Sequence, residues 1–340
     1  MILNILAPVF VFAVIVLIHE GGHFTMAKLT GMKVEEFAVG FGPKLWSVKK
    51  GETLYSLRLV PLGGFNRILG MDASESDDPR AFSKRPIWTR LLVIAAGSLF
   101  NVLLAFVIFW GALLYAGYET FPNIPVVGTV LKESSAHRQG IVPGDTILQV
   151  NGKKIETWAD IGETTRNLET KIVPVTVSHE GNEKTVTIIL QENEEGRPII
   201  GITPYLENHR VGMMQALSMS GERIIYLVKM MASALSGMIA GQKADVAGPI
   251  GVARMSAQVA DTGLLSLFLF IALLSLNLGF LNLLPVPLLD GGVLVMTLIE
   301  GLLGRELPRK VLYYIQAVGV TILLTLFIFT MCNDINGLLK

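Results

Sequence analysis

Four long apolar stretches constrain the fold of this chain more than any other feature of its sequence. They cover residues 2–18, 91–115, 264–284 and 311–331. About 20 apolar residues in a helix span a hydrocarbon core of about 30 Å, so each stretch predicts a transmembrane helix. A fifth apolar segment, 213–239, is interrupted by a glutamate, an arginine and a lysine. Its spacing predicts an amphipathic helix that lies on or partly in the membrane without crossing it.

The composition agrees with a membrane protein. Hydrophobic residues make up 51% of the 340 residues and charged residues only 16%, below the roughly 25% of soluble domains. The formal net charge is zero and no basic tract stands out, so nothing predicts a nucleic-acid partner. The single cysteine, Cys332, excludes an internal disulfide and a cysteine-rich metal site. The N-terminal run has no basic leader or small-residue cleavage site, which argues against a signal peptide.

The charges of the loops predict the orientation. Lysine and arginine gather between the first two stretches and again just after the third. Because positive loops favour the cytoplasmic side, both loops are predicted to be cytosolic. Both termini and the region from about 117 to 263 are then expected on the outer side of the membrane.

The outer region contains the pattern of a small α+β domain. A first strand is followed by a small-residue turn, the "PGD" turn of "GIVPGDTILQVNGKKI" and a second strand that ends in "NG" at 151–152. A helix is expected to begin near Thr157, and alternating strands follow in "VPVTVSH", "KTVTIIL" and "PIIGITP". This order resembles the circularly permuted PDZ domain of bacterial envelope proteases. The resemblance implies a groove that binds a peptide or a substrate tail by strand addition. The alternative is a spacer domain without a ligand.

The loop at 34–70 is predicted to form a β-hairpin or small sheet packed against the spans. In "TLYSLRLV" the residues Tyr55, Leu57 and Leu59 fall on one face, and Ser56 and Arg58 fall on the other. The alternative is a surface hairpin that only covers the helix ends.

The sequence "HEGGH" at the end of the first stretch fits the H-E-x-x-H metal-binding pattern. On a helix, His19 and His23 share a face and can bind one metal ion. Glu20 can act as the general base on an activated water. Ionisable groups in a membrane span are costly and therefore point to function. Gly21 and Gly22 weaken the helix but leave room for a neighbouring element or a substrate. The alternative is a helix end whose polar residues simply meet water.

A catalytic zinc site needs a third protein ligand, and Asp290 is the best candidate. The remaining histidines lie in or beside the outer region: His137, His179 and His209. His19 lies roughly 26 Å along the first span and Asn282 roughly 27 Å along the third, by the rise of an α-helix. Asp290 therefore reaches the depth of His19 only if segment 213–239 does not cross the membrane. Taken alone, the "DGG" at 290–292 is an ordinary turn signal.

Three motifs in this order, "HEGGH", a PDZ-like domain and "NLLPVPLLDGG", resemble the site-2 protease family. Within it, the chain is similar to the bacterial RseP-type intramembrane zinc metalloproteases, here with a single PDZ domain. The resemblance implies one Zn²⁺ per chain, bound by His19, His23 and Asp290. It implies that Glu20 is the catalytic acid and base.

The same resemblance implies how a substrate is held. Asn282 and the broken helix around Pro285 and Pro287 would hold it near the metal. "GFGPKLW" and "LVPLGGFNRILG" match the family's membrane-associated β-loop, whose edge pairs with an extended substrate, which adds Gly63, Gly64 and Phe65. The expected substrates are transmembrane proteins trimmed by a prior cleavage, such as anti-sigma factors, or remnant signal peptides. The expected location is the bacterial cytoplasmic (inner) membrane.

We therefore predict an α-helical polytopic membrane protein with four transmembrane helices, a membrane-associated β-hairpin or sheet and an inserted extracytoplasmic PDZ-like α+β domain. The predicted domains are 1–118, the first half of the membrane core with the β-loop 34–70; 119–207, the PDZ-like domain; 208–262, the non-spanning amphipathic segment; and 263–340, the second half of the core.

Two other functions fit the sequence in part. A membrane metal transporter or sensor would use the same residues, but it predicts more polar residues along the second and fourth spans. A PDZ scaffold without protease activity would leave the metal motif without a purpose.

Overall fold

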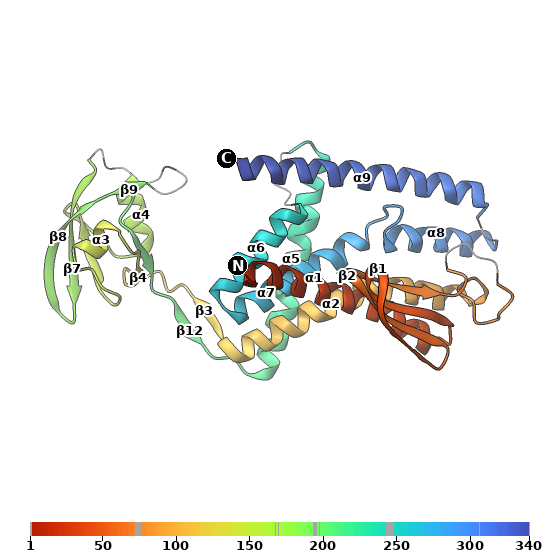
Figure 1. Cartoon of the computed structure of the whole chain (residues 1–340). Coiled ribbons are helices and arrows are strands. Elements are labelled where there is room, and N and C mark those ends of the chain that lie inside the picture. The colour runs from red at the N-terminus through yellow and green to blue at the C-terminus, as the bar shows by residue number, and fades with distance from the viewer. Residues whose placement is uncertain are drawn as a thin grey trace. The chain divides into compact units, whose positions relative to one another are not determined.

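The computed structural model describes residues 2–71, 76–166, 168, 170–192, 196, 198–242, 248–305 and 307–339. The chain forms two compact units. One unit contains Met1–Ala112 and Met213–Lys340, and the other contains Leu113–Gly212. Figure 1 shows the order of the elements along the chain.

Within the part of the first unit that the structure describes, four helices are long and apolar enough to cross a membrane, which confirms the four predicted spans. They are α1 (Ile2–Leu29), α2 (Ile87–Ala116), α7 (Leu264–Asn282) and α9 (Arg309–Leu339). The predicted first span ended at residue 18, but α1 continues to Leu29. The metal-binding pattern therefore lies inside a continuous helix and not at its edge.

The remaining helices of this unit connect the spans. Helix α5 (Met213–Ile239) has the predicted bounds and is not among the candidate spans of the described residues. Helices α6 (Pro249–Thr262) and α8 (Asp290–Leu303) were not anticipated from the sequence. The N-terminus of α6 is capped by Asp334 of α9, whose carboxylate accepts hydrogen bonds from three backbone N–H groups at 2.9–3.0 Å.

Helix α7 packs against both α1 and α2. Val11 and Ile15 of α1 pack against α7 in one buried cluster. Ala105 and Phe109 of α2 pack against α7 in another. A Cβ at Gly279 of α7 would lie 2.9 Å from a backbone carbonyl of α2, so the absent side chain permits this close approach.

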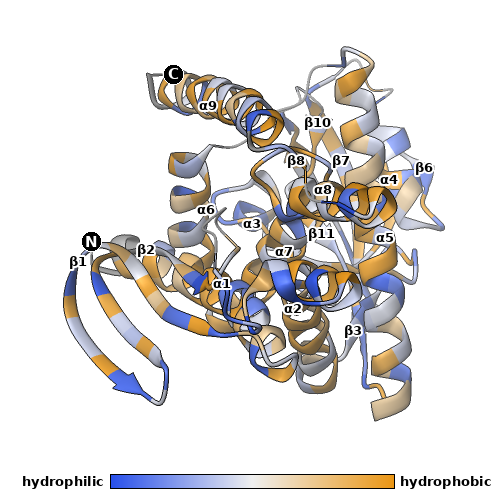
Figure 2. Cartoon of the chain, turned by 90° about the vertical axis from the view of Figure 1, so that its right-hand side faces the viewer, coloured by the Kyte–Doolittle hydropathy of each residue, from blue (hydrophilic) through white to orange (hydrophobic). Residues whose placement is uncertain are grey.

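Strands β1 (Val34–Lys50) and β2 (Thr53–Ile68) form the predicted antiparallel hairpin, whose pairing contains several register shifts. The predicted alternation of "TLYSLRLV" is present, and the apolar face points outward. Leu57 and Leu59 are exposed, whereas Ser56 is buried. Figure 2 shows the hydrophobic residues distributed along this hairpin. The inner face is polar because Glu36 accepts hydrogen bonds there from Ser56 and Arg58, at 2.7 and 2.8 Å.

The second unit has the predicted α+β order. A sheet with the order β6-β5-β7-β8 contributes Ile147, Val150, Val173, Val175, Val177 and Ile188 to its core. In addition, β4 pairs with β11, β9 with β10, and β3 with β12. The strands are β3 (Tyr118–Thr120), β4 (Val127–Val130), β5 (Thr146–Val150), β6 (Lys153–Lys154), β7 (Ile172–His179), β8 (Asn182–Ile189), β9 (Gln191–Glu192), β10 (Pro198–Ile199), β11 (Ile202–Pro204) and β12 (Glu207–His209). The helices are α3 (Ser135–Arg138) and α4 (Trp158–Arg166).

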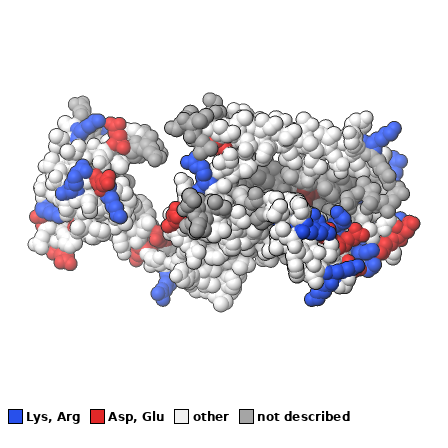
Figure 3. All heavy atoms as spheres, viewed as in Figure 1, with Lys and Arg blue, Asp and Glu red and all other residues white. Residues whose placement is uncertain are grey.

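The charged residues gather on particular parts of the surface. In the view of Figure 3, lysine, arginine, aspartate and glutamate lie over the hairpin region and over the PDZ-like unit. The face formed by the long helices carries few of them in that view. A helical face with few charged side chains suits a hydrocarbon environment, where charged groups are costly.

Candidate metal centre

Helix α1 places His19 and His23 on one face, and α8 brings Asp290 to them. Both imidazoles are buried, and their Nε2 atoms lie 3.3 Å apart. Asp290 Oδ2 lies 3.3 Å from His19 Nε2 and 3.4 Å from His23 Nε2. Among the described residues, these three form a group of side chains able to hold a metal ion.

The triangle of donor atoms fits zinc. With Zn–N and Zn–O distances of about 2.0–2.1 Å and tetrahedral angles, neighbouring ligand atoms lie about 3.3–3.4 Å apart. The three observed separations, 3.3, 3.3 and 3.4 Å, match this spacing. Three protein ligands leave a fourth position open, as a catalytic zinc site requires.

Glu20 follows His19 in α1, and the hairpin holds its carboxylate. Asn66 of β2 donates from Nδ2 to Glu20 Oε2 at 3.0 Å and also to the Glu20 backbone carbonyl. A Cβ at Gly64 would lie 3.4 Å from Glu20 Cγ and 2.8 Å from a backbone oxygen of β1. Strand β2 therefore passes beside Glu20, and a side chain at Gly64 would clash with the backbone of β1.

The two glycines of "HEGGH" differ in their surroundings. A Cβ at Gly22 would lie 2.4 Å from the backbone oxygen of Ala96, so Gly22 permits close packing of α1 on α2. A Cβ at Gly21 would meet nothing within 4 Å. Helix α2 therefore occupies the space beside Gly22, while the space beside Gly21 is open.

Helix α2 also approaches the histidines through Gly97. A Cβ at Gly97 would lie 2.3 Å from His23 Nε2 and 2.8 Å from His19 Cε1. The imidazole of His23 is further fixed because its Nδ1 lies 2.8 Å from the Val93 carbonyl oxygen. Only a glycine at position 97 leaves space for both rings.

The segment between α7 and α8 turns Asp290 toward the histidines. Leu288 adopts φ 76°, a left-handed conformation that is strained for leucine and typical of functional sites. The "DGG" is not an isolated turn, because Asp290 begins α8 and the glycines lie in its first turn. Cβ atoms at Gly291 and Gly292 would lie 2.2–2.3 Å from backbone oxygens of the preceding segment, so side chains there would block this fold.

Of the other predicted site residues, Asn282 contacts a proposed metal ligand, while Pro285, Pro287 and Phe65 have other surroundings. Asn282, the last residue of α7, has its Nδ2 3.3 Å from His19 Nε2. Pro287 packs against α9, where a Cβ at Gly319 would lie 2.6 Å from it. Pro285 is exposed. Phe65 stacks with the ring of Phe41, with ring centroids 6.4 Å apart.

The remaining histidines belong to the second unit. His179 Nδ1 lies 2.6 Å from Asp145 Oδ1, which is a contact within the PDZ-like domain. His209 Nε2 lies 2.8 Å from the Thr120 hydroxyl oxygen, between β12 and β3. The metal-binding group found among the described residues does not include these histidines.

The hairpin contains a second charged cluster, around Glu36. Burial alone raises the pKa of this carboxyl, but hydrogen bonds from Ser56 and Arg58 and the charges of Arg58 and Lys44 bring the pKa below its ordinary value. Arg58 also lies 4.9 Å above the ring of Phe65. The polar groups of this face of the hairpin therefore bond to one another within the hairpin.

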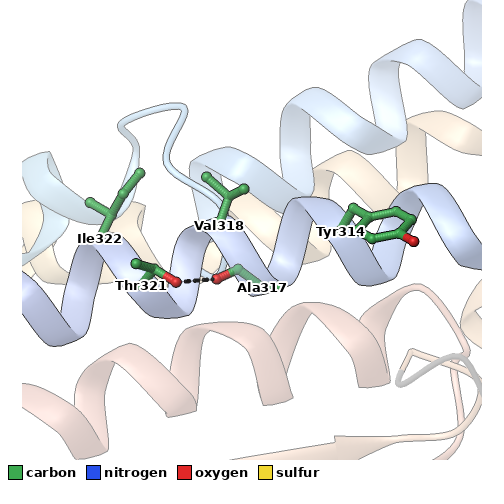
Figure 4. A pocket seen from close by; sticks show the side chains of 5 residues that line it. All are labelled: Tyr314, Ala317, Val318, Thr321 and Ile322. Atoms are coloured by element: carbon green, nitrogen blue, oxygen red, sulfur yellow. Dashed lines mark hydrogen bonds between the residues drawn. The ribbon is translucent and has the colours of Figure 1, made fainter.

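An apolar pocket of about 310 Å³ lies on α9. It is lined by Tyr314, Ala317, Val318, Thr321 and Ile322, which Figure 4 shows. The Thr321 hydroxyl donates to the Ala317 carbonyl oxygen at 2.9 Å, so this polar group is already satisfied. The pocket contains none of the metal-binding residues.

Sequence reasoning missed the residues that surround the triad. Asn66, Gly97, Ser98 and Asn101 each contact the metal-binding group or Glu20. Ser98 and Asn101 are polar residues inside an apolar stretch, and that exception was the signal that could have identified them. Asn66 gives no such signal, because an asparagine in a loop pattern is common.

Comparisons with known proteins now identify the class. The family model described as peptidase family M50 matches residues 7–326. The chain therefore belongs to peptidase family M50, the site-2 proteases, and is a multi-pass membrane zinc metalloprotease. Zinc is its cofactor.

Several relatives are similar over nearly their whole length. A protein of Clostridium acetobutylicum named as a zinc metalloprotease is 34% identical, over 98% of this chain and 97% of its own. One of Clostridium perfringens is 37% identical, over 95% and 96%. The regulator of sigma-W protease RasP of Bacillus subtilis is 28% identical, over 98% and 99%.

Solved structures match part of the chain. The PDZ domain of an SdrC-like protein of Listeria monocytogenes is 19% identical and covers 26% of this chain and 93% of that one, with a TM-score of 0.23. That of Listeria innocua is 21% identical and covers 26% and 99%, also with a TM-score of 0.23.

Proposed function

We propose that this protease cuts peptide bonds in or near the transmembrane segments of other membrane proteins, at a zinc ion held by His19, His23 and Asp290. Glu20 is the catalytic acid and base. The observation that carries the proposal is the triangle of ligand atoms from His19, His23 and Asp290, which lie 3.3–3.4 Å apart. Glu20 follows His19 directly on α1.

The chemistry divides between the metal and Glu20. Zinc, when bound, polarises the scissile carbonyl and makes water a better nucleophile near neutral pH. Glu20 accepts the proton of the attacking water and then donates it to the leaving amine. Asn66 supports this role because its 3.0 Å hydrogen bond fixes the carboxylate in one position while leaving its second oxygen available.

The surroundings of Glu20 can hold an unwound substrate. A transmembrane helix hides its peptide bonds in its own hydrogen bonds, so a substrate must become extended before it is cut. The edge of β2 at Gly63, Gly64 and Phe65 accepts such a segment by strand addition. Asn282 donates a hydrogen bond to the substrate backbone, a role supported by its position 3.3 Å from His19 Nε2. Pro285 and Pro287 hold the segment before Asp290 open, because proline cannot continue a helix.

The division of the chain suggests where each step occurs. Residues 1–118 and 263–340 form the membrane core, 208–262 form a non-spanning segment, and 119–207 form a PDZ-like domain on the extracytoplasmic side. That domain binds a peptide or substrate tail. The protein resides in the bacterial inner membrane with both termini outside and the metal near the cytosolic face, an orientation supported by the positive loops. Its substrates are proteins trimmed by an earlier cleavage, such as anti-sigma factors, or remnant signal peptides. The name of the relative RasP, regulator of sigma-W protease, supports a substrate that controls a sigma factor.

Replacement of Glu20 by glutamine tests the proposal. The change keeps the volume of the side chain but removes the base, so cleavage of a single-span substrate in detergent should fall by at least about 100-fold. The zinc content should stay at the wild-type level. Glu35→Gln on the hairpin is the matched control and should cleave normally. Undiminished cleavage by the Glu20→Gln protein would refute the assigned role.

A further inference from the structure

Helix α2 supplies one partner for each of the three proposed zinc ligands. The contacts are His23 Nδ1 to the Val93 carbonyl oxygen at 2.8 Å, Asp290 Oδ2 to the Ser98 hydroxyl at 3.4 Å, and His19 Nδ1 to the Asn101 side-chain amide at 3.3 Å. We propose that Asn101 is a positioning residue that orients His19 for zinc by accepting a hydrogen bond from its Nδ1–H. This inference rests on the proposed zinc site.

The protonation of the imidazole decides what His19 needs. A neutral histidine that binds a metal through Nε2 carries its proton on Nδ1, and that N–H requires an acceptor. His23 has the Val93 carbonyl in this place. For His19, the group at hydrogen-bond distance from Nδ1 is the amide of Asn101.

The amide of Asn101 has an oxygen available for this purpose. Its Oδ1 is buried and makes no hydrogen bond among the described residues. The oxygen and nitrogen of a side-chain amide exchange places by a 180° rotation. In the rotated orientation, Oδ1 faces His19 Nδ1 and accepts its proton. Zinc binding through Nε2 and this orientation of Asn101 therefore require each other.

The position of Asn101 argues against a packing role for its side chain. The residue is fully buried in the middle of an apolar helix, where an amide is costly unless it is hydrogen-bonded. Its backbone carbonyl accepts a separate hydrogen bond from Ser275 of α7 at 2.9 Å. This hydrogen bond between α2 and α7 involves only the backbone of Asn101, so an apolar residue at 101 would preserve it. The side-chain amide is free to bond with His19.

Two replacements with the same number of side-chain heavy atoms separate a positioning role from a packing role. Asn101→Asp keeps an acceptor for the Nδ1–H, while Asn101→Leu keeps the branched shape of the side chain and removes the acceptor. Zinc affinity is measured on the detergent-purified full chain by competition with a chelator of known affinity. We expect Asn101→Leu to bind zinc about 10–100-fold more weakly than wild type. We expect Asn101→Asp to bind it within about threefold of wild type or more tightly, because carboxylates are common partners of zinc-bound histidines.

The controls keep each result interpretable. Thr89→Val changes a buried hydroxyl on the same helix that donates to the Pro86 carbonyl oxygen, and it should bind zinc normally. If the Leu variant does not elute as a single species, Asn101→Ser replaces it, with the same expected loss because its hydroxyl is too short to span the distance.

The outcomes distinguish this inference from the zinc site itself. Normal zinc affinity in Asn101→Leu, or an equal loss in Asn101→Asp, overturns the role of Asn101. Normal affinity in His19→Ala overturns the zinc site on which it rests. Loss in His19→Ala with no loss in Asn101→Leu refutes the positioning role alone.

Discussion

Replacement of Gly97 by alanine should abolish zinc binding, although it adds only one methyl group. The new Cβ would lie 2.3 Å from His23 Nε2, whereas ordinary van der Waals contact begins near 3.4 Å. The ring must therefore retreat by at least about 1.1 Å, while functional metal–ligand distances hold to about 0.2 Å. A misplacement of about 1 Å costs about 100-fold in activity, so we expect at least that loss in cleavage together with a loss of bound zinc.

The assay compares zinc content and cleavage of a single-span substrate in Gly97→Ala and Gly111→Ala. Gly111 lies on the same helix, and a Cβ there would meet nothing within 4 Å. Both changes improve helix propensity equally, by up to about 1 kcal/mol, so only the contact with the histidines differs. If Gly97→Ala retains its zinc and its activity, the reasoning from this contact is wrong.

Three further predictions concern packing and charge. Gly22→Ala should destabilise the protein by about 1–3 kcal/mol through overpacking against α2, while Gly21→Ala should be neutral or stabilising. Thermal unfolding in detergent measures both, and equal unfolding temperatures for the two variants would contradict this prediction. Because the pKa of Glu36 is lowered, its carboxylate stabilises the hairpin above the unfolded pKa of about 4.3, and the stability is lost as pH falls through the lower folded value. Hydrogen exchange of residues 34–68 should show this acid loosening in wild type and not in Glu36→Gln; a pH-independent wild type refutes it. Arg90 and Glu300 form an almost buried ion pair at 2.6 Å. Arg90→Ala should therefore destabilise the protein by about 3–5 kcal/mol, while replacing both residues by apolar ones should destabilise it less. Equal losses of stability in calorimetry would contradict this prediction.

Local patterns in the sequence predicted the elements but not all of their limits. The amphipathic segment 213–239 formed a helix with the same bounds because its periodicity is a local property. The first span was predicted too short, because hydropathy falls at His19 while the helix continues to Leu29. Polar residues there are turned into the protein, so they mark the end of the apolar stretch and not of the helix.

Contacts between distant segments account for what the sequence did not predict. The outward apolar face of the hairpin follows from the pairing of Glu36 with Arg58, which lie 22 residues apart and on different strands. The link between Asn66 and Glu20 crosses from the hairpin to a membrane helix. Asp290 could be proposed as a neighbour of His19 because the order of the spans restricts which ends meet, and the structure places the two 3.3 Å apart. No comparable rule places an asparagine on a strand beside a helix.

The zinc content of the purified protein tests the central claim most directly. Wild type and Asp290→Ala are each dialysed against the same chelator, and the zinc per chain is then measured. We predict about one zinc per wild-type chain and far less in Asp290→Ala, because two histidines alone leave the site incomplete. Equal zinc content in the two proteins would contradict the assignment of Asp290 as the third ligand.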